Sequence, residues 1–173
     1  LRKEDLYTEE ELGRLVSAAP DIGTKALICL AAESAGRPGE IISLRVKDIA
    51  FNGITASIYF SGKMRGKMGE RKVPIVRSVP LLKMLVDGLS SPEDLLFKCK
   101  RGKAMTLTAY WRDLNNVRIK AGILKPLSGY RLRHKRLTDV FRELPETIGK
   151  RFGGHELDST HTKTYCPLSD EDV

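Results

Sequence analysis

The first 45 residues carry apolar side chains at the three- and four-residue spacing of helices. A first helix is predicted after Thr8, which forms a capping-box pattern with Glu11. Pro20 and Asp21 open a second segment, in which the pattern of residues 26–35 favours a largely buried helix. Pro38 suits the first turn of a short third helix that reaches about Arg45.

The period of the pattern changes to two between residues 48 and 75. Apolar and polar side chains alternate, and a turn rich in Gly and Lys separates this stretch from a second short apolar run, 73–75. Such alternation is typical of strands, so we expect a β-hairpin or a small antiparallel sheet. The alternating apolar positions are Ile54, Ala56, Ile58 and Phe60.

Helical spacing then returns and continues to about Tyr165, before an acidic tail over residues 169–173. Five further helices are expected, over residues 79–89, 106–120, 131–143, a short stretch from 145 and a last one around 160–165. Tyr110, Leu114 and Val117 share one face of the second of these. The sum is a mostly helical α+β domain, a single unit over residues 1–173, with a small antiparallel sheet inserted after the third helix.

Composition and charge narrow the class of protein. Hydrophobic residues make up 41% and charged residues 30%, as in a folded domain that needs no disulfide or metal to hold its core. Thirty Lys and Arg against 22 Asp and Glu give a net charge of +8, which favours a polyanionic partner. Three widely separated cysteines favour a reducing, cytoplasmic setting. The longest apolar run is too short to cross a bilayer, so no membrane association is expected.

Several enzyme classes lack their motifs here. The sequence contains no GxxxxGK[ST] phosphate loop, no HExxH and no GxSxG. Its three histidines do not have metal-ligand spacing. Nucleotide hydrolysis and zinc chemistry are therefore not favoured, and we expect neither a metal nor a cofactor.

Basic side chains and a tyrosine remain as candidates for chemistry. Arg37 stands at a predicted helix start, where free N–H groups already attract phosphate; its ordinary alternative is a surface pair with Glu40. Lys63 lies at the hairpin turn, and the segment 130–136 carries a run of basic residues at a helix start. Tyr165 would need nearby cations to act as a nucleophile, since the ordinary pKa of tyrosine is about 10. Each feature alone also fits a solvated surface.

Taken in order, these segments resemble the tyrosine recombinase (phage integrase) family, over roughly residues 12–168. The resemblance implies the catalytic-domain fold of that family. The matching segments are Gly36-Arg37-Pro38-Gly39-Glu40, Ser61-Gly62-Lys63 with Arg71-Lys72-Val73-Pro74-Ile75, Tyr130-Arg131-Leu132-Arg133-His134, Phe152-Gly153-Gly154-His155 and Thr162-Lys163-Thr164-Tyr165.

Two positions depart from the family pattern. Tyr130 stands where most members have His, which resembles the integrases of archaeal viruses and plasmids. The hairpin is also longer and richer in lysine than usual, so that Lys67 rivals Lys63 as the catalytic lysine. A phenol donates or accepts a hydrogen bond but is not an imidazole, which leaves the acid–base role of Tyr130 open.

The resemblance implies a site-specific DNA recombinase, an integrase, that works without metal or ATP. Tyr165 would attack the scissile phosphate and form a 3′-phosphotyrosyl link. Arg37 and Arg133 would bind the non-bridging oxygens, and Lys63 would protonate the leaving 5′ oxygen. His155 would orient the phosphate, and Tyr130 would take part of the role of the usual histidine.

The implied partners are double-stranded DNA carrying attachment sites and further copies of the chain, as a tetramer on DNA. Because the chain begins with Leu1, we expect it to be a C-terminal fragment whose N-terminal DNA-binding region is absent. Three alternatives remain: a DNA-binding module without catalysis, a dimer-resolving recombinase or type IB topoisomerase-like strand transferase, and an unrelated basic helical domain. The expected DNA contacts here are Arg65, Lys67, Arg131, His134 and Lys135.

Overall fold

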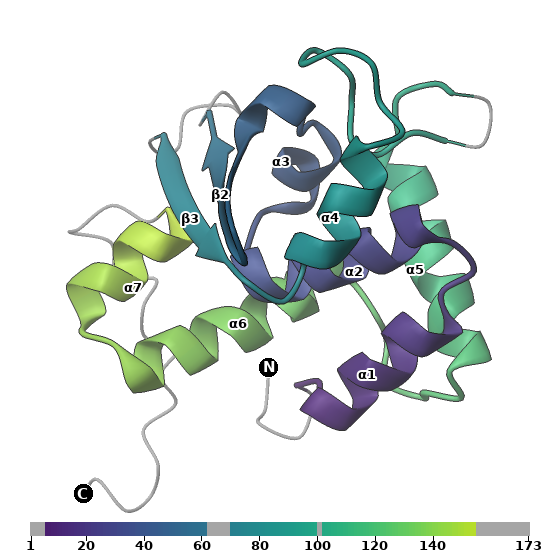
Figure 1. The fold of residues 1–173 in the computed structure, drawn as a ribbon. Coiled ribbons are helices and arrows are strands. Elements are labelled where there is room, and N and C mark those ends of the chain that lie inside the picture. The colour runs from purple at the N-terminus through teal and green to yellow at the C-terminus, as the bar shows by residue number, and fades with distance from the viewer. Residues whose placement is uncertain (1–5, 62–69, 100–101, 155–173) are drawn as a thin grey trace, which may run out of the picture.

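The computed structural model describes residues 6–61, 70–99 and 102–154. Within these residues it contains seven α-helices, a short 3-10 helix and one sheet of three antiparallel strands (Figure 1). The predicted fold class is confirmed. In chain order the elements are α1 (Glu9–Ala18), α2 (Ile22–Ser34), α3 (Pro38–Ile42), η2 (Val46–Asp48), β1 (Ile49–Asn52), β2 (Thr55–Phe60), β3 (Arg71–Ile75), α4 (Val79–Val86), α5 (Leu107–Lys120), α6 (Gly129–Glu143) and α7 (Glu146–Gly153).

The starts of the first helices follow from their capping residues. The Thr8 hydroxyl accepts a hydrogen bond from the Glu11 N–H at 3.1 Å, and the Glu11 carboxylate accepts one from the Thr8 N–H at 2.8 Å. Asp21 accepts from the Thr24 N–H at 2.7 Å at the start of α2. Both predicted helix starts are confirmed, because these side chains satisfy N–H groups that the first helical turn leaves unpaired.

The sheet has the order β1-β2-β3, with all neighbours antiparallel. Ala56, Ile58 and Phe60 are buried in the core, as the alternation predicted. Ile54, which the alternation grouped with them, lies outside the strand and is 82% exposed. It lies beside Gly53 in the tight turn that joins the paired residues Asn52 and Thr55, and Gly53 supplies the positive φ of 60° there.

Two helices are shorter than the pattern predicted. The third ends at Ile42 rather than near Arg45, because the chain turns into η2, where the Asp48 carboxylate accepts the Arg45 N–H at 2.8 Å. The helix expected over residues 79–89 ends at Val86.

Helix α2 lies at the centre of the hydrophobic core. It packs against α1, α4, α6 and strand β3, and Leu27, Ile28 and Leu30 on it are almost wholly buried. Tyr110, Leu114 and Val117 on α5 are buried as predicted. Helix α6 packs onto α2, and α7 packs onto both α6 and β3 (Figure 1). None of the helices within the described residues is long and apolar enough to span a membrane.

Gly129, the first residue of α6, is expected to admit no larger side chain. A Cβ there would lie 2.3 Å from the hydroxyl oxygen of Tyr110, a ring that is fully buried. Gly129→Ala is therefore expected to lower the free energy of unfolding by about 1–3 kcal/mol, measured by urea denaturation. Gly13→Ala in α1 is the control, since its Cβ would meet no atom within 4 Å. It is expected to raise stability by about 0.5–1 kcal/mol, and equal effects at the two glycines would contradict this packing.

Candidate active site

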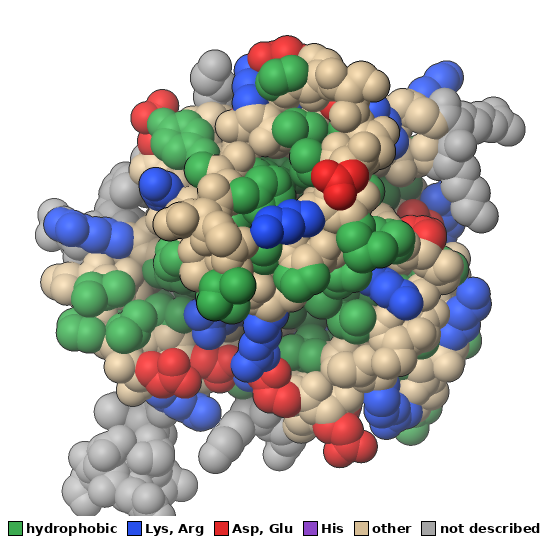
Figure 2. All heavy atoms as spheres, viewed as in Figure 1, with side chains coloured by type: hydrophobic (Ala, Val, Ile, Leu, Met, Phe, Trp, Pro, Cys, Tyr) green, Lys and Arg blue, Asp and Glu red, His purple; other side chains and the backbone are tan. Residues whose placement is uncertain are grey.

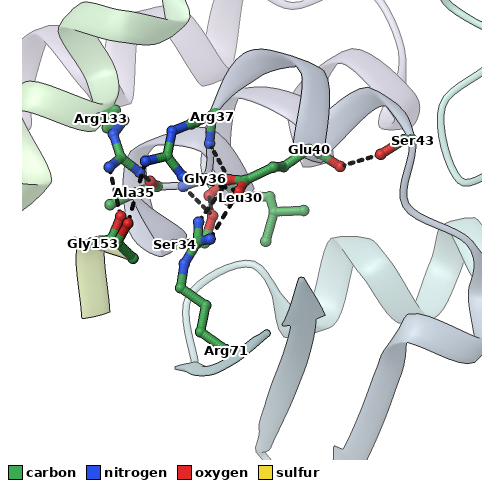
Figure 3. Close-up of polar contacts among 11 residues, drawn as sticks. Leu30, Ser34, Ala35, Gly36, Arg37, Glu40, Ser43, Arg71, Arg133 and Gly153 are labelled. Carbon is green, nitrogen blue, oxygen red and sulfur yellow. Dashed lines mark hydrogen bonds and ion pairs between the residues drawn. The ribbon is translucent and has the colours of Figure 1, made fainter. Parts of the chain in front are cut away.

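Arg37 and Arg133 lie side by side, although they come from different helices (Figure 3). Arg37 precedes α3, and Arg133 lies in the second turn of α6. Arg37 Nη2 donates to the carbonyl oxygen of Gly154 at 3.3 Å, and Arg133 Nη2 donates to that of Gly153 at 2.6 Å. Two consecutive carbonyls at the end of α7 therefore hold the two guanidinium groups next to each other.

Arg133 is buried, with 4% of its surface exposed. Its Nη1 donates to the carbonyl oxygen of Ala35. Ala35 ends α2 in the left-handed conformation, with φ 50°. Arg133 thus ties the end of α2 to the end of α7, and its guanidinium plane is fixed before any ligand binds.

A buried carboxylate, Glu40, lies between Arg37 and a third arginine, Arg71. Arg71 binds it with both terminal nitrogens, Nη1 to Oε1 at 2.8 Å and Nη2 to Oε2 at 2.7 Å. Arg37 Nη1 reaches Oε1 at 3.2 Å, and the Arg37 backbone N–H donates to Oε2 at 2.7 Å. The pair of Arg37 with Glu40 that we weighed from the sequence is therefore present, but Arg71 makes the shorter contacts.

Sequence reasoning missed this part of the site. It treated Arg71 only as part of the lysine hairpin. The signal that was available is the alternation along β3, where Arg71 takes the same inward-facing parity as Val73 and Ile75. A charged side chain at such a position needs a buried partner of opposite charge.

The charge of Glu40 is stable over a wide pH range. Burial by itself raises the pKa of this carboxyl group, but the hydrogen bonds and charge of Arg71, with those of Arg37, outweigh it and lower the pKa to about 2. Glu40 is therefore ionised at neutral pH and shares its negative charge between two guanidinium groups.

Acid is expected to destabilise the protein through Glu40. Because the folded-state pKa of about 2 lies below the ordinary 4.5, the stabilisation is complete above pH 4.5 and is lost as the pH falls from 4.5 to 2. The loss is expected to be about 3 kcal/mol, measured by urea unfolding at a series of pH values. The Glu40→Gln variant has no carboxyl group to titrate at this position. Its free energy of unfolding should therefore fall by about 3 kcal/mol less than that of wild type between pH 4.5 and pH 2. An equal decline in both proteins would contradict the assignment.

Tyr130 lies at the N-terminal end of α6, one turn before Arg133, and its side chain is 61% exposed. Its ring stacks on Trp111 of α5, with centroids 5.9 Å apart and planes 25° apart. Trp111 in turn contacts the ring of Tyr110 edge-on. Trp111 was not singled out from the sequence, although its spacing within α5 places it next to the buried face.

The predicted DNA contacts on α6 differ in their surroundings. Arg131 is partly exposed. His134 is buried, with Nδ1 3.4 Å from the Thr138 hydroxyl oxygen. Lys135 pairs with Glu9 and Asp139 and lines a cavity of about 650 Å³ between α1, α2 and α6. These placements do not favour a DNA contact for His134 or Lys135. Consecutive residues of a helix point in different directions, so some side chains of a continuous basic segment face the protein interior.

Five predicted residues lie outside the described residues: Lys63, Arg65, Lys67, His155 and Tyr165. Phe60 at the end of β2 pairs with Arg71 at the start of β3, and Gly154 is the last described residue before His155. Of these described residues, Arg71 contacts Glu40 and the Gly154 carbonyl contacts Arg37, so both belong to the arginine cluster.

The surface charge is mixed on the face shown in Figure 2. Lys and Arg side chains there are interspersed with Asp and Glu and with hydrophobic patches, so the net charge of +8 does not form a single basic patch on that face. The residues that the structure describes contain no group of three or more His, Cys, Asp or Glu side chains arranged to hold a metal ion.

The phage integrase family matches residues 6–172 of the chain. Tyrosine recombinase XerD of Oceanobacillus iheyensis is 24% identical over 93% of this chain and 57% of the relative. The crystal structure of XerA recombinase superposes with a TM-score of 0.79 at 25% identity, covering 96% of this chain and 60% of that one. XerH site-specific recombinase, in a pre-cleavage complex with its difH substrate, shares the fold at 20% identity with a TM-score of 0.76, covering 96% of this chain and 52% of that one.

The chain thus spans little more than half the length of these relatives. The match nevertheless includes every described segment that carries the arginine cluster. Together with the paired guanidinium groups of Arg37 and Arg133, it shows that this chain belongs to the phage integrase family.

Proposed function

We propose that this chain is the catalytic domain of a site-specific DNA recombinase that cleaves and rejoins DNA through a 3′-phosphotyrosyl link on Tyr165. The observation that carries this proposal is the pair of neighbouring guanidinium groups, Arg37 and Arg133, held by consecutive backbone carbonyls. Two fixed cations at one point are suited to a phosphate whose negative charge increases in the transition state. Neutralising Glu40 needs only one arginine, whereas three guanidinium groups gather here.

Each arginine would bind one non-bridging oxygen of the scissile phosphate. The guanidinium group is planar and holds several N–H donors in one plane, so one arginine can bind the backbone carbonyls that hold it and a phosphate oxygen together, whereas an ammonium group lacks this geometry. Because the carbonyls of Gly153 and Gly154 and the Glu40 carboxylate already hold these groups, little reorganisation is needed when the phosphate arrives.

The proton transfers would belong to residues around this pair. Tyr165 gives its proton to water as its oxygen bonds to phosphorus and the bond from phosphorus to the 5′ oxygen breaks, and that leaving 5′ oxygen gains a proton from Lys63 or Lys67. Tyr130 would hydrogen-bond the phosphate from the exposed start of α6, three residues from Arg133, and His155 would do so from the residue after Gly154. The free 5′-hydroxyl of a partner strand then attacks the phosphotyrosyl bond, which restores Tyr165 and conserves the bond energy. That cycle consumes no ATP.

The proposed partners are double-stranded DNA and further copies of the chain. XerH was solved with its difH substrate and the integrase of phage lambda as a dimer bound to a core site. Recombination joins four strands, so four active sites are needed, and a tetramer on two duplexes is the simplest assembly. Of the three predicted DNA contacts on α6, Arg131, which is partly exposed beside Tyr130, is the one that we propose contacts the DNA backbone.

A nicked suicide substrate tests this function. The substrate carries the attachment site and a nick a few nucleotides 3′ of the scissile phosphate. After cleavage the short fragment that bears the free 5′-hydroxyl diffuses away, which traps the covalent intermediate. Wild-type protein in EDTA and without nucleotide is expected to give a protein–DNA band on a denaturing gel. If DNA is bound but no band forms, also with the full-length protein, the chain is a binding module. If a band forms but only supercoil relaxation follows, without strand exchange between two sites, the topoisomerase alternative holds.

A further inference from the structure

The contacts of Glu40 indicate a role for Arg71 in the active site. This inference rests on the function proposed above. We propose that Arg71 is a positioning residue that occupies Glu40 and so prevents this carboxylate from neutralising Arg37. Arg37 then keeps its positive charge for the scissile phosphate.

The hydrogen bonds of Glu40 carry the argument (Figure 3). A carboxylate has about four acceptor positions, and all four are used here. Arg71 takes one on each oxygen, in the bidentate geometry that gives the strongest pairing, at 2.8 and 2.7 Å. The Arg37 side chain has a single contact at 3.2 Å, and the remaining position goes to its backbone N–H.

The burial of the three side chains also indicates that Arg71, rather than Arg37, is the main partner of Glu40. The side chains of Arg71 and Glu40 are 6% and 8% exposed, whereas that of Arg37 is 27% exposed. The Arg71–Glu40 pair therefore lies inside the protein and is screened little by water, while Arg37 is at its outer edge. Two guanidinium groups and one carboxylate leave one net positive charge, and that charge lies toward Arg37.

Arg71 is also held so that it cannot turn outward. Its guanidinium carbon lies 4.4 Å from the centre of the Phe60 ring, and a Cβ on Gly154 would lie 3.0 Å from its Nη1. Its Nε is buried and has no hydrogen-bond partner among the described residues. A buried N–H group without a partner costs free energy, and Nε would avoid that cost if the side chain lay at the surface, where water could accept its hydrogen bond. Arg71 is thus enclosed between the sheet and the end of α7, and it does not reach DNA itself.

Without Arg71, Glu40 would have two vacant acceptor positions and one neighbouring cation. Arg37 would then pair with it through both terminal nitrogens, as arginine and carboxylate do when nothing competes. That pair is neutral. The scissile phosphate would then be stabilised by the positive charge of Arg133 alone, although Arg37 is still present.

A double-mutant cycle tests this inference with wild type, Arg71→Gln, Glu40→Gln and the double variant. The readouts are the single-turnover rate of covalent complex formation on saturating suicide DNA, the DNA dissociation constant and the thermal unfolding midpoint. In the presence of the native Glu40, Arg71→Gln is expected to slow cleavage about 100-fold. In the Glu40→Gln background the same change is expected to slow it less than about 3-fold, because no carboxylate is left to neutralise Arg37. DNA affinity should change less than about 3-fold throughout.

An equal loss in both backgrounds would overturn the inference, since a purely structural role of Arg71 would not depend on the charge of residue 40. If Arg71→Gln alone does not fold, the two proteins that carry Glu40→Gln decide: a difference between them above about 10-fold overturns the inference. Arg71→Lys, which keeps the charge but not the bidentate contact, should then lie between wild type and the 100-fold loss. Failure of the proposed function is distinguished beforehand, because wild type would then give no covalent complex at all.

Discussion

Arg133→Lys is expected to slow single-turnover DNA cleavage by about 10²–10³-fold while changing DNA affinity less than about 3-fold. Lysine keeps the charge but offers one ammonium group, which cannot donate to Ala35, to Gly153 and to a phosphate oxygen in one plane. Most DNA affinity comes from the other phosphate contacts, so binding should persist. The measurements are covalent complex formation on a suicide substrate and fluorescence anisotropy with labelled DNA.

Arg142→Lys is the matched control for that change. It lies on the same helix, near its end, and is exposed. Its cleavage rate is expected to equal that of wild type. Thermal unfolding of both variants separates loss of chemistry from loss of fold. A folded Arg133→Lys protein that cleaves at the wild-type rate would rule out a role for this guanidinium in the transition state.

Tyr165→Phe is expected to abolish covalent complex formation altogether, because it removes the protein oxygen that bonds to phosphorus in the proposed reaction. Fold and DNA affinity should be unchanged, since one hydroxyl group is lost. Tyr130→Phe is the informative comparison: an exposed phenol three residues from Arg133 is itself a chemically plausible nucleophile. As a hydrogen-bonding residue it should lower the rate by about 10–100-fold and still give the covalent band.

The reverse result would reassign the chemistry. If Tyr130→Phe abolishes the band and Tyr165→Phe does not, the nucleophile lies at the start of α6. Its stack on Trp111 would then have to release the ring toward the phosphate.

Local signals in the sequence predicted most of this fold. The capping pattern of Thr8 and Glu11 gave the start of α1, because those hydrogen bonds form within four residues. The buried face of α5 followed from the spacing of Tyr110, Leu114 and Val117. Ile54 fits the alternating pattern of the strand in the sequence but does not belong to the strand. The chain reverses at Gly53, so Ile54 lies in the turn.

The sequence predicted which residues belong to the candidate site, but it did not predict which of their side chains contact each other. Arg37 and Arg133 were chosen from the sequence, and the structure shows that the end of α7 brings them together. The bidentate pair of Arg71 with Glu40 joins residues of a strand and a helix that no local pattern connects. The inward placement of His134 and Lys135 likewise depends on how α6 packs onto α2 and on the ion pair of Lys135 with Glu9 of α1, which charge along the chain does not reveal.

The residue that bonds to DNA can be identified chemically. Wild-type protein trapped on the suicide substrate is digested with nuclease and trypsin, and the peptide that carries the residual nucleotide is identified by tandem mass spectrometry. We expect the added mass on the peptide that begins at Thr164, with the phosphate on the Tyr165 oxygen. The same mass on the peptide that ends at Arg131, and therefore on Tyr130, would contradict it.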